Sequence, residues 1–241
     1  MKNDVAFVNI GDELLLGQII DTNLQTLAKE LGKIGRYVHE VRIVGDDATM
    51  IIETVIELSK RYNVVFTSGG IGPTHDDITT MCIAEAFDVD IVLNESAKKM
   101  IDDSLKKQGR KYLPEHEKMA FIPEGATLIQ NDISGAPGFK IGNVYVMAGV
   151  PEIFKNMVEN AVETMVVGNK LHFETIYTHI PETYIATQLL QIANLYTNVS
   201  IGIYPHSNKE YQTEIVLKCT DVELLQNCFN DVESMLLGVR I

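Results

Sequence analysis

Short apolar runs alternate with amphipathic segments along the first part of the chain. A nearly continuous apolar run is typical of a strand covered on both faces, and apolar side chains three and four residues apart indicate one buried helix face. These patterns predict strands at residues 5–10 and 64–66 and helices at residues 22–34, 48–62 and 79–87. Alternating apolar and polar residues predict a half-exposed strand at residues 38–44. The β-α-β-α-β-α order predicts an α/β fold, with a three-layer domain built on a mostly parallel sheet.

The pattern changes near residue 168. Before it, the sequence predicts a polar helix at residues 96–108, a hairpin at residues 138–147 that turns at Gly142-Asn143, and a helix that begins at Pro151. After a linker at residues 167–170, it predicts strands at residues 173–179, 199–204 and 212–219, and helices at residues 184–196 and 222–237. This β-α-β-β-α order indicates a second, smaller α/β domain. The predicted domains are residues 1–168 and residues 171–241.

The charge of the chain argues against two classes of partner. The formal net charge is −13 and the pI is near 4.8. Binding to nucleic acid or to an anionic membrane surface requires cationic surface, so we expect neither partner. The order of the second domain resembles a KH-type RNA-binding module, but no G-x-x-G loop with basic flanks accompanies it. No apolar run approaches the roughly 18 residues of a membrane span.

The cysteines indicate a reducing compartment. Cys82, Cys219 and Cys228 lack metal-ligand spacing, and we expect buried free thiols. The N-terminus leads directly into a predicted strand without the apolar region of a signal peptide. These features predict a cytoplasmic protein.

The most informative segment follows the predicted strand at residues 64–66. Gly69, Gly70 and Gly72 allow a sharp turn and a close approach by a ligand. The next helix would present free N–H groups that suit phosphate. Asp76 and Asp77 sit at the predicted helix start, where they would repel a bare phosphate, so they suggest a metal or proton-transfer role. The alternative is that they only cap the helix.

Three predicted strands end in acidic or glycine-rich loops. These loops are residues 11–13, residues 46–47 and residues 69–77. In a parallel sheet, ligands bind beyond the carboxyl ends of the strands, so the three loops should meet at one edge. Neither a P-loop, nor a dinucleotide fingerprint, nor a G-x-S-x-G elbow is present.

Four segments together resemble a known family. They are residues 11–17 with residues 21–23, residues 44–47, residues 69–79 (Gly-Gly-Ile-Gly-Pro-Thr-His-Asp-Asp-Ile-Thr), and residues 148–152 (Ala-Gly-Val-Pro-Glu). They resemble the molybdopterin-binding superfamily of MoaB, Mog and gephyrin, and most closely the competence/damage-inducible protein A (CinA) family. Ala148 departs from the family pattern, which has Pro there.

The CinA resemblance implies a metal-dependent pyrophosphatase that hydrolyses ADP-ribose or a similar nucleotide diphosphate. Two alternatives remain: Mog-like adenylyl transfer from ATP to molybdopterin, and a pterin- or nucleotide-binding module without turnover. CinA proteins usually carry a further amidohydrolase domain that acts on nicotinamide mononucleotide, and we expect that activity to be absent. The resemblance also implies a homo-oligomer, for which a homodimer is the expectation.

The candidate site residues fall into two groups. Asp77 and Asp46 are the candidate catalytic residues and the ligands of a divalent metal such as Mg²⁺. The candidate residues for binding the nucleotide, or molybdopterin, come from all the loops: Gly11, Asp12, Ser68, Gly69, Gly70, Gly72, Pro73, Thr74, Asp76, Gly135, Pro137, Gly149 and Pro151.

Overall fold

The computed structural model describes residues 3–206 and 210–239, and the chain divides into two compact units, Met1–Gly168 and Asn169–Ile241. The first unit is built on a six-stranded sheet in the order β2-β1-β3-β8-β7-β6. Its strands are β1 (Asn3–Ile10), β2 (Val38–Val44), β3 (Tyr62–Ser68), β6 (Thr127–Ile129), β7 (Gly138–Ile141) and β8 (Val144–Met147).

The sheet is parallel from β2 to β8 and antiparallel beyond it. Strand β1 pairs in parallel with β2 and β3, and β3 pairs in parallel with β8. The predicted hairpin reverses the chain between β7 and β8, where Gly142 adopts a φ of 55°. The predicted α/β fold with a mostly parallel sheet is therefore confirmed.

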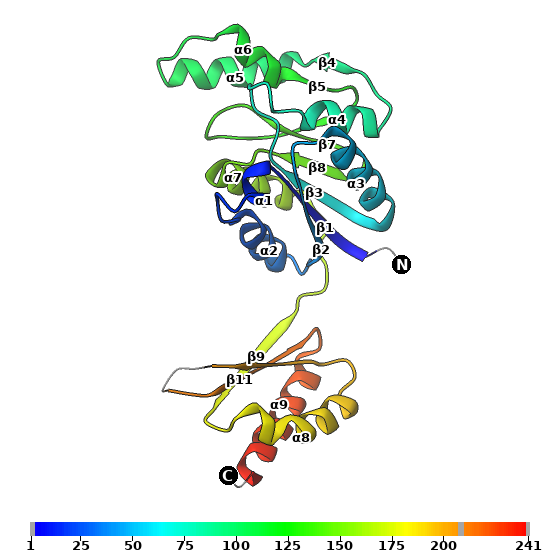
Figure 1. Ribbon diagram of the computed structural model, residues 1–241, viewed down its shortest axis with the longest axis vertical. Coiled ribbons are helices and arrows are strands. Elements are labelled where there is room, and N and C mark those ends of the chain that lie inside the picture. Colours follow the sequence, from blue (N-terminus) through cyan, green and yellow to red (C-terminus); the bar gives the residue numbers. More distant parts are fainter. Residues whose placement is uncertain (1–2, 207–209, 240–241) are drawn as a thin grey trace. The chain divides into compact units, whose positions relative to one another are not determined.

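Helices cover both faces of this sheet (Figure 1). One face carries α2 (Asn23–Lys33) and α7 (Pro151–Glu163), and the other carries α3 (Ala48–Arg61) and α4 (Thr79–Ala86). Side chains of β1 alternate between the two cores: Phe7 packs in the cluster that holds Leu27 of α2, and Val8 packs in the cluster that holds Val55 of α3. Burial on both faces explains why residues 5–10 are almost continuously apolar.

Between α4 and β7 the chain forms a smaller layer that the sequence only partly predicts. The expected polar helix is α5 (Glu95–Lys107), and it packs with β4 (Ile91–Leu93) and a 3-10 turn (Lys118–Ala120). The short helix α6 (Pro114–Glu117) and strand β5 (Phe121–Pro123) flank that turn in the chain. Strands β4 and β5 pair with each other in a separate two-stranded sheet. These short elements, like β6 and α1 (Asp12–Leu15), are too brief for a hydrophobic period to reveal them.

The second unit has the predicted β-α-β-β-α order. It contains β9 (His172–Thr178), α8 (Glu182–Leu195), β10 (Ser200–Pro205), β11 (Thr213–Cys219) and α9 (Val222–Gly238). The strands form an antiparallel sheet in the order β10-β11-β9, and its core includes Ile215, Leu189 and Val232.

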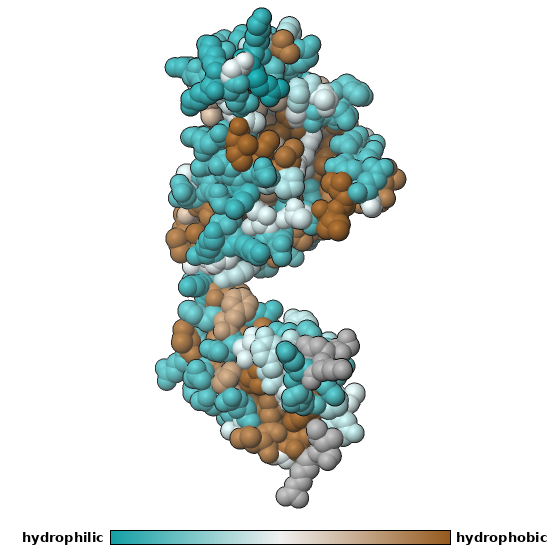
Figure 2. Space-filling model, turned by 90° about the vertical axis from the view of Figure 1, so that its left-hand side faces the viewer, coloured by the Kyte–Doolittle hydropathy of each residue, from teal (hydrophilic) through white to brown (hydrophobic). Residues whose placement is uncertain are grey.

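Other expectations from the sequence concern the cysteines and the surface. Cys82, Cys219 and Cys228 are buried free thiols, as predicted. Within the described ranges, no helix has the length and apolar character needed to cross a membrane. On the face shown in Figure 2, hydrophilic side chains predominate and hydrophobic ones gather in separate patches.

Candidate functional site

The glycine-rich loop that follows β3 is packed against two neighbouring elements. Gly69 has a φ of +107°, and a Cβ atom there would lie 2.2 Å from the carbonyl oxygen of Ile10 at the end of β1. Gly70 has a φ of +69°, and a Cβ atom there would lie 2.1 Å from Oγ1 of Thr79 in α4. Only glycine fits both the backbone conformation and the space at these two positions.

The two aspartates in this loop do not cap α4, so the alternative that they serve only as helix caps is wrong. Helix α4 begins at Thr79 with Ile78 as its N-cap residue, and no side chain caps it. Instead, Oδ2 of Asp77 accepts hydrogen bonds from the Thr74 backbone N–H, at 2.8 Å, and from the Thr74 hydroxyl, at 2.5 Å. These two hydrogen bonds stabilise the turn from residue 74 to residue 77, which precedes the helix, so Asp77 closes the loop.

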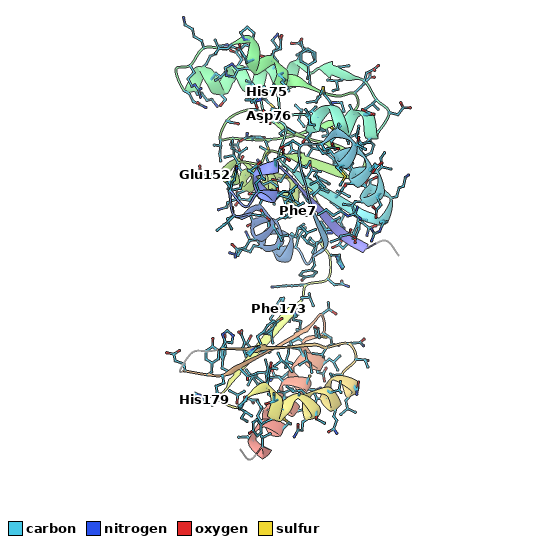
Figure 3. The ribbon with its side chains drawn as sticks, in the orientation of Figure 1. Phe7, His75, Asp76, Glu152, Phe173 and His179 are labelled. Atoms are coloured by element: carbon cyan, nitrogen blue, oxygen red, sulfur yellow. The ribbon has the colours of Figure 1, made fainter. Side chains whose placement is uncertain are left out.

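Asp76 lies beside His75 in the same loop (Figure 3). The Thr74 hydroxyl and the backbone of Asp76 itself hold the pKa of the Asp76 carboxyl below its usual value. Asp76 therefore remains charged at neutral pH. In the cavity described below, it adds to the negative charge of the acidic loop.

Asp12 and Asp46 join the ends of β1 and β2. The Asp12 backbone N–H donates to Oδ2 of Asp46 at 3.1 Å, and the Asp46 backbone N–H donates to Oδ1 of Asp12 at 3.2 Å. A Cβ atom on Gly45 would lie 2.4 Å from the Asp12 carboxylate, so glycine at that position lets the two loops approach each other. These two reciprocal hydrogen bonds hold the carboxylates of Asp12 and Asp46 in place at this edge of the sheet.

Asn23 joins the ends of β3 and β8. Its Nδ2 donates to Oγ of Ser68 and to the carbonyl oxygen of Gly149, both at 2.8 Å, and the residue is 5% exposed. Oδ1 of Asn23 and Oγ1 of Thr79 are buried without a hydrogen-bond partner among the described residues. Buried polar atoms of this kind usually form a hydrogen bond with water or with a ligand. These two atoms, at the base of the loops, can therefore form such a bond.

A second loop faces these strand ends and is shaped by Asn131. Its Oδ1 accepts from the backbone N–H groups of Ile133 and Ser134, at 3.0 and 3.2 Å, and its Nδ2 donates to the carbonyl oxygen of Ala136 at 2.8 Å. Gly135 lies against α5, where a Cβ atom would meet Cβ of Ser104 at 2.2 Å. Asn131 is 2% exposed, so the loop is held from within.

The loops line a partly open cavity of about 690 Å³ within the first unit. A volume of this size suits a drug-sized ligand or a nucleotide. Most of the candidate residues line it: Gly11, Asp46, Gly69, Gly70, Gly72, Pro73, Asp76, Asp77, Pro137, Gly149 and Pro151. The sequence-predicted loops thus converge, as the carboxyl ends of parallel strands require.

Four candidates do not line the cavity and act on its walls instead. Asp12 holds Asp46, Thr74 holds Asp77, and Ser68 is fully buried beneath Asn23. Gly135 is the point where the second loop packs on α5. Direct contact with a ligand is therefore a weaker expectation for these four than for the residues that line the cavity.

Several lining residues were not predicted from the sequence. An apolar wall comes from α5, the 3-10 turn, the Asn131 loop and α7: Ile101, Leu105, Met119, Ile133, Ala136 and Ile153. Polar side chains that also line the cavity are Gln108, Arg110 and His116. One signal in the sequence could have indicated this region. Gly109 follows the basic residues Lys106 and Lys107, and a glycine in that position is typical of the C-terminal end of a helix.

The carboxylates offer ligands for a divalent cation but do not form a complete set. Among the described residues, no group of three or more His, Cys, Asp or Glu side chains could hold a metal ion. Mg²⁺ is commonly held by one or two carboxylates, with substrate phosphates and water completing its shell. Asp46 and Asp77 are two such carboxylates in the lining, and the hydrogen bonds from described residues to the Asp77 carboxylate go to Oδ2.

Comparison with known proteins agrees with this geometry. Residues 6–167 match the family model described as "Probable molybdopterin binding domain". The chain belongs to this family. The MoaB/Mog-like resemblance read from the four motifs is thereby confirmed.

Relatives of this molybdopterin-binding family include CinA-like proteins. A protein of Pyrobaculum aerophilum is 30% identical over 99% of this chain and 100% of its own length. A CinA-like protein of Crocosphaera subtropica is 37% identical over 81% of this chain, which spans 50% of that protein. The crystal structure of CinA from Thermoplasma acidophilum is 30% identical, with a TM-score of 0.60 over 67% of this chain and 96% of that one.

The second unit also has a family match, which sequence reasoning did not anticipate. Residues 170–240 match the model described as "FAD synthase, middle domain". The second unit is therefore similar to a domain type that is named for FAD synthase.

Proposed function

We propose that this protein is a metal-dependent pyrophosphohydrolase that cleaves the diphosphate bond of ADP-ribose or of a similar nucleotide diphosphate. The observation that carries the proposal is the composition of the cavity. It combines glycine backbone at Gly69 and Gly70, the carboxylates of Asp46 and Asp77, and an apolar wall that includes Ile101, Leu105 and Met119. Backbone without side chains suits a close approach by phosphate, and the apolar wall suits a planar base.

The reaction requires water and one bond cleavage. Water adds to one phosphorus atom of ADP-ribose, the bond from that phosphorus to the bridging oxygen breaks, and the products are AMP and ribose 5-phosphate. Asp46 and Asp77 would hold a divalent metal such as Mg²⁺, which when bound neutralises phosphate charge and lowers the pKa of water. The Thr74–Asp77 hydrogen bonds orient the Asp77 carboxylate before the ligand arrives.

The FAD synthase likeness of the second unit widens the class of substrates to test. FAD, like ADP-ribose, carries an AMP group in a diphosphate, so one cavity could accept both. Support for a nucleotide substrate therefore comes from both units, although the cavity lies in the first.

A second candidate function rests on the family match of the first unit. Adenylyl transfer from ATP to molybdopterin would use the same phosphate loop and the same carboxylates. A binding module without turnover is the third possibility. Anion binding follows from the glycine loop in all three cases, whereas the reaction depends on which second substrate enters.

A screen of substrates against metals separates these functions. ADP-ribose, FAD and ATP are incubated with the protein and Mg²⁺, Mn²⁺ or Co²⁺, and products are separated by ion-exchange chromatography. The proposal expects AMP from ADP-ribose without any acceptor. Turnover of ATP only when molybdopterin is added would favour adenylyl transfer, and thermal stabilisation by a nucleotide without products would favour a binding module.

A further inference from the structure

The cavity has an uneven distribution of charge that the proposed site residues do not explain. Four carboxylates line it: Glu13, Asp46, Asp76 and Asp77. Among the described residues that line the cavity, Arg110 is the single Lys or Arg side chain. A nucleotide diphosphate is itself anionic, so a fixed cation should be important for holding it.

The backbone of Arg110 is fixed by the end of helix α5. The Arg110 N–H donates to the carbonyl oxygen of Leu105 at 2.9 Å, and the Gly109 N–H donates to the carbonyl oxygen of Lys106 at 3.0 Å. Gly109 has a φ of +68°. These two hydrogen bonds and the left-handed conformation of Gly109 form a Schellman motif. This motif ends the helix and fixes the backbone direction of the residue after the glycine. Arg110 therefore leaves a rigid helix end rather than a free loop.

The guanidinium of Arg110 is not engaged elsewhere. No hydrogen bond or ion pair joins it to another residue in the described part of the chain. Two cations of helix α5 do have partners: Lys106 pairs with Asp102, and Lys98 pairs with Glu117. A planar group with five N–H donors and no protein partner is suited to an external oxyanion.

The segment after Arg110 is joined to the acidic loop and adds a second donor. The Lys118 ammonium donates to the carbonyl oxygen of Thr74, in the loop that Asp77 closes. Nδ1 of His116 accepts from the Leu113 backbone N–H at 2.8 Å, so the neutral imidazole carries its proton on Nε2. His116 lines the cavity with Arg110, so the segment supplies donors to the same cavity as the carboxylates.

We propose that Arg110 is the residue that binds the diphosphate group of the nucleotide, with Nε2 of His116 as a second donor. This inference rests on the proposed function in one respect, namely that the ligand is a nucleotide diphosphate. Arg110 positions the ligand: it holds the phosphate oxygens in the cavity that Asp46 and Asp77 also line. It discriminates in favour of ligands with two linked phosphates over nucleosides, which offer no matching oxyanion.

A binding measurement that is independent of turnover tests this role. The probe is α,β-methylene-ADP, in which carbon replaces the bridging oxygen so that hydrolysis between the phosphates is blocked. Isothermal titration calorimetry with Mg²⁺ compares the wild-type protein with Arg110→Gln, Arg110→Lys and Lys111→Gln. Lys111 is the matched control because it is the next residue, is exposed, loses the same charge and does not line the cavity.

Loss of a hydrogen-bonded charge pair should weaken binding roughly ten- to hundredfold in Arg110→Gln. Arg110→Lys should recover only part of that loss, and Lys111→Gln should bind like the wild type. Equal dissociation constants for Arg110→Gln and Lys111→Gln would overturn the assignment, as would a wild-type protein that does not bind the probe. A role limited to the end of α5 would lower the melting temperature of Arg110→Gln without changing its dissociation constant, and would also overturn it.

Turnover of ADP-ribose by the same variants keeps this inference separate from the proposed function. Weak probe binding by Arg110→Gln, together with no hydrolysis by any variant, would support the role of Arg110 and refute the pyrophosphohydrolase. Full hydrolysis with an unchanged KM in Arg110→Gln would support the enzyme and refute the role of Arg110.

Discussion

Replacing Asp77 by Asn separates its structural role from its chemical one. Both hydrogen bonds from Thr74 end on Oδ2 of Asp77, at 2.8 and 2.5 Å, and the carbonyl oxygen of Asn can accept both. Because Thr74 is exposed, the lost charge should cost less than about 1 kcal/mol of folding free energy. Asp77→Ala loses both bonds and should cost about 1–3 kcal/mol.

The effect of Asp77→Asn on activity should be much larger than its effect on stability. An amide is a poor replacement for a charged metal ligand or a general base, and the loss of one such group typically lowers the rate by ~10²-fold or more. The assay is ADP-ribose turnover with Mg²⁺, with the melting temperature recorded for each variant. Asp90→Asn is the control, because Asp90 is exposed and lies outside the cavity. Full activity in Asp77→Asn would refute the assignment and leave Asp46 or Asp76 as the remaining candidates.

Four further expectations address the fold and its assembly. Gly70→Ala should lower the unfolding free energy, measured by urea titration, by about 1–3 kcal/mol. The reason is that a φ of +69° is strained for Ala and the new Cβ atom would contact Thr79. Unchanged stability would contradict the loop geometry. Hydrogen bonds from Arg42 and Arg61 lower the pKa of Glu57 to about 2. A lowered carboxyl pKa stabilises the fold above the unfolded value near 4.5, so the melting-temperature gap between wild type and Glu57→Gln should close as the pH falls from about 4.5 to about 2. Limited proteolysis should cut at residues 166–170, which are all exposed, and cleavage first within either unit would argue against the domain boundary. Light scattering should give twice the monomer mass of 26.9 kDa, and a value at 26.9 kDa would refute the homodimer.

The larger elements were predictable because their burial repeats along the sequence. Residues 5–10 have side chains in both cores, and α2 buries Leu27 and Leu31 on one face. Such patterns predict strands and helices directly. The three-residue strands β4 and β5 contain too few positions for a period, so only their pairing in space reveals them.

The candidate site likewise contains features that the sequence reveals and features that only the tertiary structure reveals. The glycine-rich loop was recognisable because Gly69 and Gly70 occupy positions that exclude other residues. The loop-closing role of Asp77 was not, since it depends on the distance from Thr74 rather than on the helix that follows. Arg110 was missed because its place in the cavity depends on how α5 packs against the loops, and no local pattern encodes that contact.

The most direct test of the proposed function is hydrolysis of ADP-ribose in water enriched with ¹⁸O. Mass spectrometry of the products should show AMP and ribose 5-phosphate in equal amounts, with one ¹⁸O atom in one of them, in the presence of a divalent metal and not with chelator. Attack by water at the diphosphate is the only proposed step, so the label must enter a product phosphate. Failure of every metal to raise AMP above the rate without protein would contradict the account.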